Sequence, residues 1–411
     1  MTARAEGSLN LKAIQQAARR LEGVIHPTPL DFSATFSRLT GSRVYLKLEN
    51  LQKTGSFKIR GAYNKICTLD EASRQKGVIA ASAGNHAQGV ASAATYAGIA
   101  SLIVMPENAP VSKVTATQGY GARVVLAGEN YDQAFNHALA LQKETGAVFI
   151  HSFDDPEIIA GQGTIGLELL AAVPDLDAVV APVGGGGLIA GAALAAKTIR
   201  PAVQVIGVQA ESAPAVYQLF HQTQKSGPPP AGRTIADGIN VRRPGKLTRE
   251  LIARFVDDVV LVDDEEIAEA ILLLLERSKL MVEGAGAAGL AALLAGKIFL
   301  PEKKTAVILS GGNVDINLIS IIIERGLVKS GRRLLVSVLL PDQPGSLSRL
   351  LALLAAARAN LISVSHDRIQ PEVPIKEAAV DLVLETRDAA HRQLILDTLV
   401  QNGYKLKKHF N

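Results

Sequence analysis

The chain of 411 residues has no tryptophan, a single cysteine, and only ten phenylalanines and seven tyrosines. One cysteine, Cys67, excludes an internal disulfide framework and a cysteine-based metal cluster. We interpret it as a small buried apolar residue. So few aromatic side chains disfavour a base-stacking platform for nucleic acid. The basic residues are scattered and the net charge is only +4, so we expect no basic face for nucleic acid either.

The sequence also lacks a hydrophobic run long enough to cross a bilayer. We expect no signal peptide at the N-terminus, and the apolar stretch at residues 267–275 is short and flanked by acidic residues. These absences predict a cytoplasmic protein without a membrane partner. Apolar residues are plentiful, at 48% against 20% charged, so the chain can bury a large core in about two to three domains.

Short apolar runs alternate with helical patterns rich in small residues, such as residues 87–96 and 188–196. This alternation predicts an α/β architecture with parallel sheets. Glycine-rich turns follow several of the runs, at the strand ends where open α/β sheets bind their ligands. The predicted strands are residues 44–48, 78–81, 101–104, 123–126, 178–183, 203–208 and 305–309.

The pattern changes near residues 329–332. The remaining chain predicts strand, helix, strand, strand, helix and strand, which is the ferredoxin-like split unit. The helices carry apolar residues at helical spacing, and one of the strands alternates between apolar and polar residues. The predicted elements are strand 334–340, helix 346–359, strands 361–369 and 378–386, helix 388–402 and strand 404–409.

The motif GSFKIRGA, residues 55–62, contains a lysine between two apolar residues, with Phe57 and Ile59 on either side of Lys58. An amine partly removed from water loses its proton more readily, which makes it a nucleophile for a carbonyl and a base. Considered alone, Lys58 is more often an ordinary exposed lysine.

The motif SAGNHAQGVA, residues 82–91, joins a predicted strand to a predicted helix through a polar turn. Backbone N–H groups at such a helix start bind a carboxylate or a phosphate. Asn85 adds a side-chain amide and His86 a hydrogen-bond donor. The alternative is a helix cap made by Ser82 or Asn85, with a structural histidine beside it.

The motif GGGGLIAGA, residues 184–192, follows another strand, and its glycine amides can surround an anion. It also contains a GxGxxA match at Gly185, Gly187 and Ala190. Glu211 follows roughly where a ribose-binding acid would lie. An NAD-binding unit therefore stays open as an alternative.

A fourth motif, LSGGNVD at residues 309–315, contains Ser310, which either caps the following helix or hydrogen-bonds a ring nitrogen. In this order and spacing, the four motifs resemble those of the fold-type II pyridoxal-phosphate enzymes, which share the tryptophan synthase β-like fold. The chain most closely resembles the threonine dehydratases (threonine ammonia-lyases), over residues 20–325. The tail resembles an ACT regulatory domain, with PDQPGSL at residues 341–347 matching the ligand loop of that family.

The resemblance implies a role for each motif residue. Lys58 would form the Schiff base with pyridoxal 5'-phosphate and, once displaced by the substrate amine, remove the α proton. Ser310, a neutral partner of the ring nitrogen, would leave the ring a weaker electron sink, which suits elimination better than transamination. The other implied cofactor ligands are Phe57, Asn85, Gly184, Gly185, Gly186, Gly187 and Leu188. The implied substrate loop comprises Ser82, Ala83, Gly84, Asn85 and His86.

Further positions are informative through the same resemblance. Ala83 stands where related serine racemases carry a serine, so racemisation is disfavoured. Glu211 matches a cation-binding glutamate and Ala215 offers a backbone ligand. Tyr217 replaces an acid there, so a monovalent metal ion is favoured over a divalent one. Glu283, in VEGAGA, either lies near the cofactor ring or serves as a structural hydrogen-bonding residue.

These observations predict a large cofactor-binding domain at residues 1–52 and 153–331, a small inserted α/β domain at 53–152 and an ACT domain at 332–411. The predicted activity is deamination of L-threonine to 2-oxobutanoate and ammonia, with L-serine slower and isoleucine or valine as effector. A serine dehydratase or related hydroxy-amino-acid lyase, an NAD-dependent oxidoreductase and a non-catalytic amino-acid sensor are the alternatives. We expect a homodimer or homotetramer.

Overall fold

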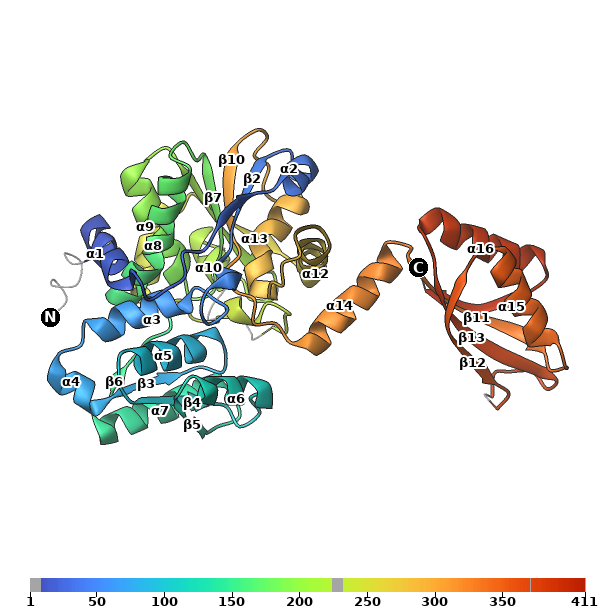
Figure 1. The fold of residues 1–411 in the computed structure, drawn as a ribbon, viewed down its shortest axis with the longest axis horizontal. Coiled ribbons are helices and arrows are strands. Elements are labelled where there is room, and N and C mark those ends of the chain that lie inside the picture. Colours follow the sequence, from blue (N-terminus) through green and yellow to red (C-terminus); the bar gives the residue numbers. More distant parts are fainter. Residues whose placement is uncertain (1–8, 224–231, 370, 411) are drawn as a thin grey trace. The chain divides into compact units, whose positions relative to one another are not determined.

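The computed structural model describes residues 9–223, 232–369 and 371–410. The chain divides into two compact units, Met1–Val314 and Asp315–Asn411, and each combines helices with β-sheet (Figure 1). The predicted α/β class is therefore confirmed. None of the described helices is both long and apolar enough to span a bilayer.

A six-stranded sheet forms the centre of the first unit, in the order β1-β2-β10-β7-β8-β9. Its strands are parallel except for β1, which pairs antiparallel with β2. The strands are β1 (Leu30–Phe32), β2 (Arg43–Lys47), β7 (Ala178–Pro182), β8 (Gln204–Ala210), β9 (Asp258–Val262) and β10 (Lys304–Ile308). The four predicted strands of this sheet are present to within two residues at each end.

β7 lies inside this sheet and all five of its residues are buried. Val179 and Ala181 pack into one hydrophobic core with residues of α8 (Pro156–Ala172) and α9 (Gly187–Ile199). Val180 instead lies against Gly289 of α13 (Gly284–Leu294). Successive residues of a strand point to opposite faces, so helices cover both faces of the sheet. This double burial explains why the strand has an unbroken apolar sequence.

A second, fully parallel sheet has the order β5-β4-β3-β6. Its strands are β3 (Val78–Ala81), β4 (Ser101–Met105), β5 (Arg123–Leu126) and β6 (Val148–Phe149). All four lie within residues 53–152, and the six strands of the first sheet lie outside that range. The domain boundaries of the sequence analysis themselves stay a prediction. The remaining helices of the unit are α1 (Leu11–Leu21), α2 (Ala34–Thr40), α3 (Lys58–Cys67), α4 (Glu71–Lys76), α5 (Asn85–Tyr96), α6 (Val111–Gly119), α7 (Tyr131–Thr145), α10 (Ala215–Phe220), α11 (Lys246–Phe255) and α12 (Asp264–Leu273).

Helices α3 and α8 pack unusually close together, because glycines face each other where they meet. A Cβ added to Gly161 of α8 would lie 2.6 Å from the backbone oxygen of Arg60. A Cβ added to Gly61 of α3 would lie 2.7 Å from the backbone oxygen of Ile158. Any larger residue at these positions would push the helices apart. The position of Lys58, the first residue of α3, is therefore set by the packing of α3 against α8 within the first unit.

The second unit contains α14 (Ile316–Lys329), β11 (Arg333–Pro341), α15 (Ser346–Ala356), β12 (Asn360–Asp367), β13 (Glu377–Glu385), α16 (Ala389–Gln401) and β14 (Lys405–Phe410). After α14 this is the predicted βαββαβ order, with an antiparallel sheet β12-β13-β11-β14. Leu334 and Val336 pack with Leu350 of α15 and Ile395 of α16 in one core. Helix α14 is grouped with this unit, whereas the sequence analysis placed residues 316–329 in the large domain.

Candidate active site

Lys58 is the first residue of α3, and its amino group is shielded from water. The side chain is partly buried, and Nζ donates a hydrogen bond to the backbone oxygen of Ser152 at 3.0 Å. The ring of Phe57 lies 5.2 Å from Nζ. Burial lowers the pKa of Lys58 to about 8, and the nearby carboxylate of Glu283 opposes this by favouring the charged amine. An amine with this pKa is neutral often enough near pH 8 to act as a nucleophile or a base.

A buried ion network anchors α3 two residues beyond Lys58. Arg60 is completely buried; its Nε and Nη2 each donate to Glu49 at 2.7 Å, and its Nη1 donates to Glu168 at 2.5 Å. Lys47 Nζ completes the network with a 2.6 Å contact to Glu168. Burial alone would lower the pKa of Arg60, but the two carboxylates raise it above its ordinary value. The two positive and two negative charges balance, so α3 is held without a net buried charge.

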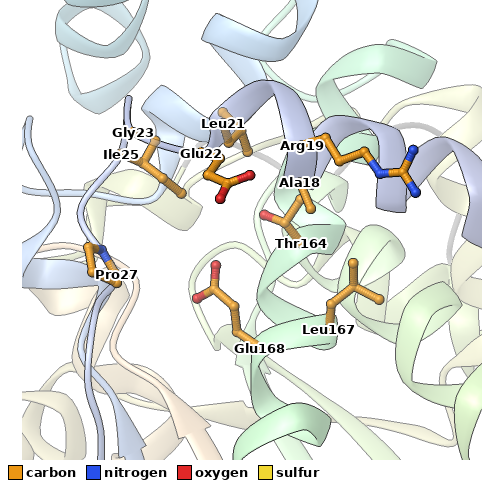
Figure 2. A pocket seen from close by; sticks show the side chains of 10 residues that line it. All are labelled: Ala18, Arg19, Leu21, Glu22, Gly23, Ile25, Pro27, Thr164, Leu167 and Glu168. Atoms are coloured by element: carbon orange, nitrogen blue, oxygen red, sulfur yellow. The ribbon is translucent and has the colours of Figure 1, made fainter.

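Glu168 is the member of this network that reaches the surface. It lines a pocket of about 430 Å³ between α1, the loop that follows it and α8 (Figure 2). Burial would raise the pKa of Glu168, but Arg60 and Lys47 bring it below its usual range. The negative charge of this carboxylate is thus already balanced by the positive charges of Arg60 and Lys47. Sequence reasoning missed the network because Glu168 lies 108 residues after Arg60, and because Arg60 is the one member inside the GSFKIRGA motif.

Two motifs more than 250 residues apart are joined by backbone hydrogen bonds. Phe57 N donates to the backbone oxygen of Ser310 at 3.1 Å, and Gly312 N donates to Gly55 O at 2.8 Å. Ser310 itself is buried directly after β10. Ser310 and Lys58 therefore have a fixed spatial relation, as the cofactor assignment requires. In the same segment, the buried hydroxyls of Thr54 and Ser56 have no hydrogen-bond partner among the described residues.

Asn85 lies at the start of α5 between two polar side chains. Its Nδ2 donates to Glu283 Oε1 at 2.6 Å, and its Oδ1 accepts from Asn313 Nδ2 at 2.7 Å. Burial raises the pKa of Glu283 to about 7, although the hydrogen bond from Asn85 favours the ionised form. The structure thus places Glu283 beside Asn85. The sequence analysis assigned no role to Asn313, and its only signal was its place in the motif that contains Ser310.

The turn before α5 uses the backbone amides of Ser82 and Gly84 in its own hydrogen bonds and leaves the first turn of the helix without a side-chain cap. Ser82 Oγ accepts from Gly84 N at 3.1 Å, and Gly84, at the helix cap position, receives no side-chain cap for the first turn of α5. His86 is buried and pairs through Nε2 with the backbone oxygen of Ile150 at 2.9 Å. Burial lowers the pKa of His86 to about 3, so the ring is neutral. A carbonyl accepts only, so Nε2 carries the proton and Nδ1 has none to donate to a carboxylate. Any contact of His86 with the substrate would therefore use its backbone N–H.

The four glycines at 184–187 form the turn between β7 and α9. Gly186 has a φ of +95° and caps α9 without a side-chain hydrogen bond, so the amides of its first turn are available to an anion. Leu188 follows within the first turn of α9 and is buried. The turn is closely packed, because a Cβ on Gly185 would overlap the ring of Phe153. Thr248 Oγ1 donates a hydrogen bond to the backbone oxygen of Gly185 at 2.8 Å.

The implied cation site contains little that would hold a metal. Glu211 is exposed after β8 and lines a pocket of about 320 Å³ with Ser212, Asp263 and Asp264. Ala215 is buried at the start of α10. Within residues 9–223, 232–369 and 371–410, no group of three or more His, Cys, Asp or Glu is arranged as metal ligands. A monovalent site at Glu211 and Ala215 stays a prediction.

These groups fit pyridoxal phosphate. The site provides an amine of lowered pKa, a glycine turn whose amides suit a phosphate, a side-chain amide and a neutral hydroxyl. The fold and these groups define a pyridoxal-phosphate-dependent enzyme of fold type II. The comparisons with known proteins support this class independently. The family described as pyridoxal-phosphate dependent enzyme matches residues 21–311, and the ACT domain family matches residues 334–403.

Relatives named L-threonine ammonia-lyase match nearly the whole chain. The protein from Thermotoga maritima is 51% identical over 97% of this chain and 99% of its own length. The one from Geobacter sulfurreducens is 49% identical over 95% and 97%. Among solved structures, maize serine racemase has a TM-score of 0.73 at 37% identity, covering 78% of this chain and 99% of that one. The processed form of threonine deaminase isoform 2 from Solanum lycopersicum has a TM-score of 0.73 at 36% identity, covering 76% and 87%. The chain belongs to the threonine ammonia-lyase family of pyridoxal-phosphate-dependent enzymes and carries a C-terminal ACT domain.

Proposed function

We propose that this chain deaminates L-threonine to 2-oxobutanoate and ammonia, with L-serine as a slower substrate. The observation that carries the proposal is the shielded amine of Lys58, at the start of a helix that the interior holds in place. Pyridoxal phosphate, when bound, supplies an electron sink for the pair left at Cα. The names of the two relatives that match almost the full chain support the choice of threonine.

The residues would divide the work as follows. Lys58 Nζ would hold the cofactor through its aldehyde group and, once freed by the substrate amine, would accept the Cα proton. The amides of Gly184, Gly185, Gly186, Gly187 and Leu188 hold the phosphate, and Phe57 packs beside the amine. Asn85 donates to the ring hydroxyl, and Ser310 meets the ring nitrogen without protonating it. The backbone of Ser82, Ala83, Gly84, Asn85 and His86 receives the substrate carboxylate.

The balance of the reaction follows from these roles. The Cα–H bond breaks toward Lys58, and the Cβ–O bond breaks as the β hydroxyl leaves with a proton as water. The released enamine then takes up water and loses ammonia to give the oxo acid. A neutral group such as Ser310 at the ring nitrogen suits this sequence, because the pair of the Cα–H bond becomes the Cα–Cβ double bond as the hydroxyl leaves with the Cβ–O pair, so no pair has to stay on the ring.

A direct assay tests the substrate. Purified protein with added pyridoxal phosphate should give 2-oxobutanoate and ammonia from L-threonine, with a higher kcat/KM than for pyruvate formation from L-serine. A preference for serine would favour the serine dehydratase alternative. A colourless protein that binds NAD and releases neither oxo acid would favour the oxidoreductase alternative and contradict the proposal.

For the ACT unit, we propose an amino-acid effector, isoleucine first and valine second. Supporting this, Gly345 has a φ of +86° and caps α15 without a side-chain hydrogen bond, so the N–H groups that begin this helix have no side-chain acceptor and suit a carboxylate. Beside the turn, Arg368 Nε donates to Asp342 Oδ1 at 2.9 Å. The proposal includes a homodimer or homotetramer. Regulation by an effector requires that it bind two states of the protein unequally, and here we propose that these are two quaternary states.

Truncation after Lys329 tests this proposal, because every proposed cofactor ligand precedes the cut. The truncated protein should keep threonine deamination and lose any response to isoleucine or valine. An unchanged isoleucine response in the truncated protein would show that the sensor lies elsewhere. If neither protein responds to any amino acid but the truncated one forms a smaller oligomer, the unit serves assembly and the effector proposal is wrong.

A further inference from the structure

We propose that Asn313 is a positioning residue for the cofactor, acting through the amide of Asn85, and that Glu283 holds the other end of the same amide. The inference rests on the proposed contact between Asn85 and the cofactor ring hydroxyl. It assigns two residues that do not themselves touch the cofactor in this account. In sequence, Asn85 lies 198 residues before Glu283 and 228 residues before Asn313.

The orientation of Asn313 is fixed by a group that only accepts hydrogen bonds. Its side-chain amide lies 2.8 Å from the backbone oxygen of Thr54, so the facing atom must be Nδ2. The same Nδ2 lies 2.7 Å from Asn85, and a longer 3.4 Å contact reaches Gln88 Oε1. With its two hydrogens directed at Thr54 and Asn85, Asn313 requires an acceptor atom at Asn85.

The orientation of Asn85 follows from that of Asn313. Its Oδ1 must face Asn313, so its Nδ2 faces Glu283, where it donates to Oε1 at 2.6 Å. The two ends agree when Glu283 is ionised, because a carboxylate accepts only. The Nδ2 group has two hydrogens and Glu283 takes one, which leaves one N–H for the cofactor. In the reversed orientation, Asn85 would present an oxygen to the carboxylate and an NH₂ to another NH₂.

Glycines on both sides leave the three side chains no room to rearrange. Gly55 has a φ of +68°, and a Cβ there would overlap Asn313 Oδ1. A Cβ on Gly311 would lie 2.5 Å from Glu283 Oε1 and 3.1 Å from Asn85 Nδ2. Both glycines belong to the motifs that contain Lys58 and Ser310. The close packing therefore ties the amide of Asn85 to the two other proposed cofactor contacts.

A double-mutant cycle tests whether Asn313 acts through Asn85. Asn313→Asp keeps the shape but removes the donor, so Asn85 loses its fixed orientation. We expect the dissociation constant for pyridoxal phosphate to rise about tenfold and the absorption maximum of the bound cofactor to shift. In an Asn85→Ala background, the same substitution should change the dissociation constant by less than about twofold, because its target is gone. Asn130→Asp, at the cap of α7, is the matched control and should change neither quantity.

Each outcome separates this inference from the function on which it rests. If Asn85→Ala leaves cofactor affinity and absorption unchanged, the proposed contact of Asn85 is wrong and the inference falls with it. If Asn85→Ala alters them and Asn313→Asp does not, only the inference is contradicted. If Asn313→Asp weakens cofactor binding equally in the parent and in the Asn85→Ala background, Asn313 acts independently of Asn85, which also contradicts the inference. Should Asn313→Asp fail to fold, Asn313→Ala enters the same cycle with the same expectations.

Discussion

Glu49 and Arg60 form a bidentate ion pair in which both side chains are completely withdrawn from water. Arg60 lies two residues after the proposed catalytic lysine, on the same helix. The pair therefore connects the segment that follows β2 to the helix that begins with Lys58. A buried pair of this kind is costly to break from one side, because the remaining charge has no solvent.

The first prediction concerns this pair. Glu49→Gln should lower the free energy of unfolding by about 3–5 kcal/mol, because it leaves Arg60 with a single carboxylate partner in the interior. Urea unfolding of the cofactor-free protein measures the change. Asp175→Asn, which removes the exposed partner of Lys304, is the control and should have no measurable effect. Equal effects of the two substitutions would show that the buried network does not stabilise the fold.

The second prediction concerns pH. Because burial lowers the pKa of Lys58 from 10.5 to about 8, the folded protein holds this proton less tightly than the unfolded chain does. Folding carries the full cost of burying the charged amine below pH 8, and that cost disappears as pH rises from 8 toward 10.5. In cofactor-free protein, modification of Lys58 by an amine reagent, followed by mass spectrometry, should have a midpoint near pH 8.

Two comparisons check the cause of that midpoint. Glu283→Gln should lower the pH of the modification midpoint of Lys58 further, because the carboxylate of Glu283 favours the charged amine. Denatured protein should return it to about 10.4. A midpoint near 10 in the folded protein would contradict the shielding of Lys58.

The third prediction tests the glycine turn. Gly185→Ala places a methyl group against the ring of Phe153, and overpacking of this kind costs about 1–3 kcal/mol. Cofactor affinity should fall correspondingly, and adding Phe153→Ala should restore part of it by opening space. Gly119→Ala, where a Cβ meets open space, is the control. Unchanged affinity in Gly185→Ala would show that the turn tolerates side chains and is not a close phosphate cradle.

The fourth prediction tests the partner of the ring nitrogen. Ser310→Ala should keep the fold and the cofactor but reduce turnover about fivefold, the equivalent of one neutral hydrogen bond. Ser310→Asp should protonate the ring nitrogen and increase conversion of the cofactor to its amine form during turnover. Rates and product distributions identical to those of the parent in both variants would refute the electronic argument.

Sequence patterns predicted the fold well where strands are buried on both faces, as in β7, and where apolar spacing is regular, as in α15. They missed β1 and β6, which have three and two residues, and β9, which begins with Asp258 and follows Asp257. Short or acid-flanked strands owe their existence to pairing with neighbours rather than to their own composition. The apolar pattern of α14 likewise does not show that this helix belongs to the second unit.

Site chemistry was predictable where one motif carries it, and not where distant segments meet. Lys58, Asn85 and Ser310 each lie within a recognisable motif. The contacts of Glu283 and Asn313 with Asn85 become visible only once the chain is folded, although Glu283 already stood out in the sequence as a residue near the ring or a structural hydrogen-bonding residue. For His86 the structure favours the structural alternative, because the carbonyl of Ile150 accepts the single proton of the neutral ring. Such contacts arise because polar groups buried in the interior need hydrogen-bond partners, and a sequence pattern does not show which partners the fold supplies.

The most direct test of the account is to locate the covalent link. The holoprotein, reduced with borohydride, digested and analysed by mass spectrometry, should carry the cofactor on Lys58 and on no other lysine. Lys58→Ala protein treated in the same way should carry none and should lose the visible absorption. A cofactor found on another lysine, or retained by Lys58→Ala, would contradict the assignment of Lys58 as the residue that binds the cofactor.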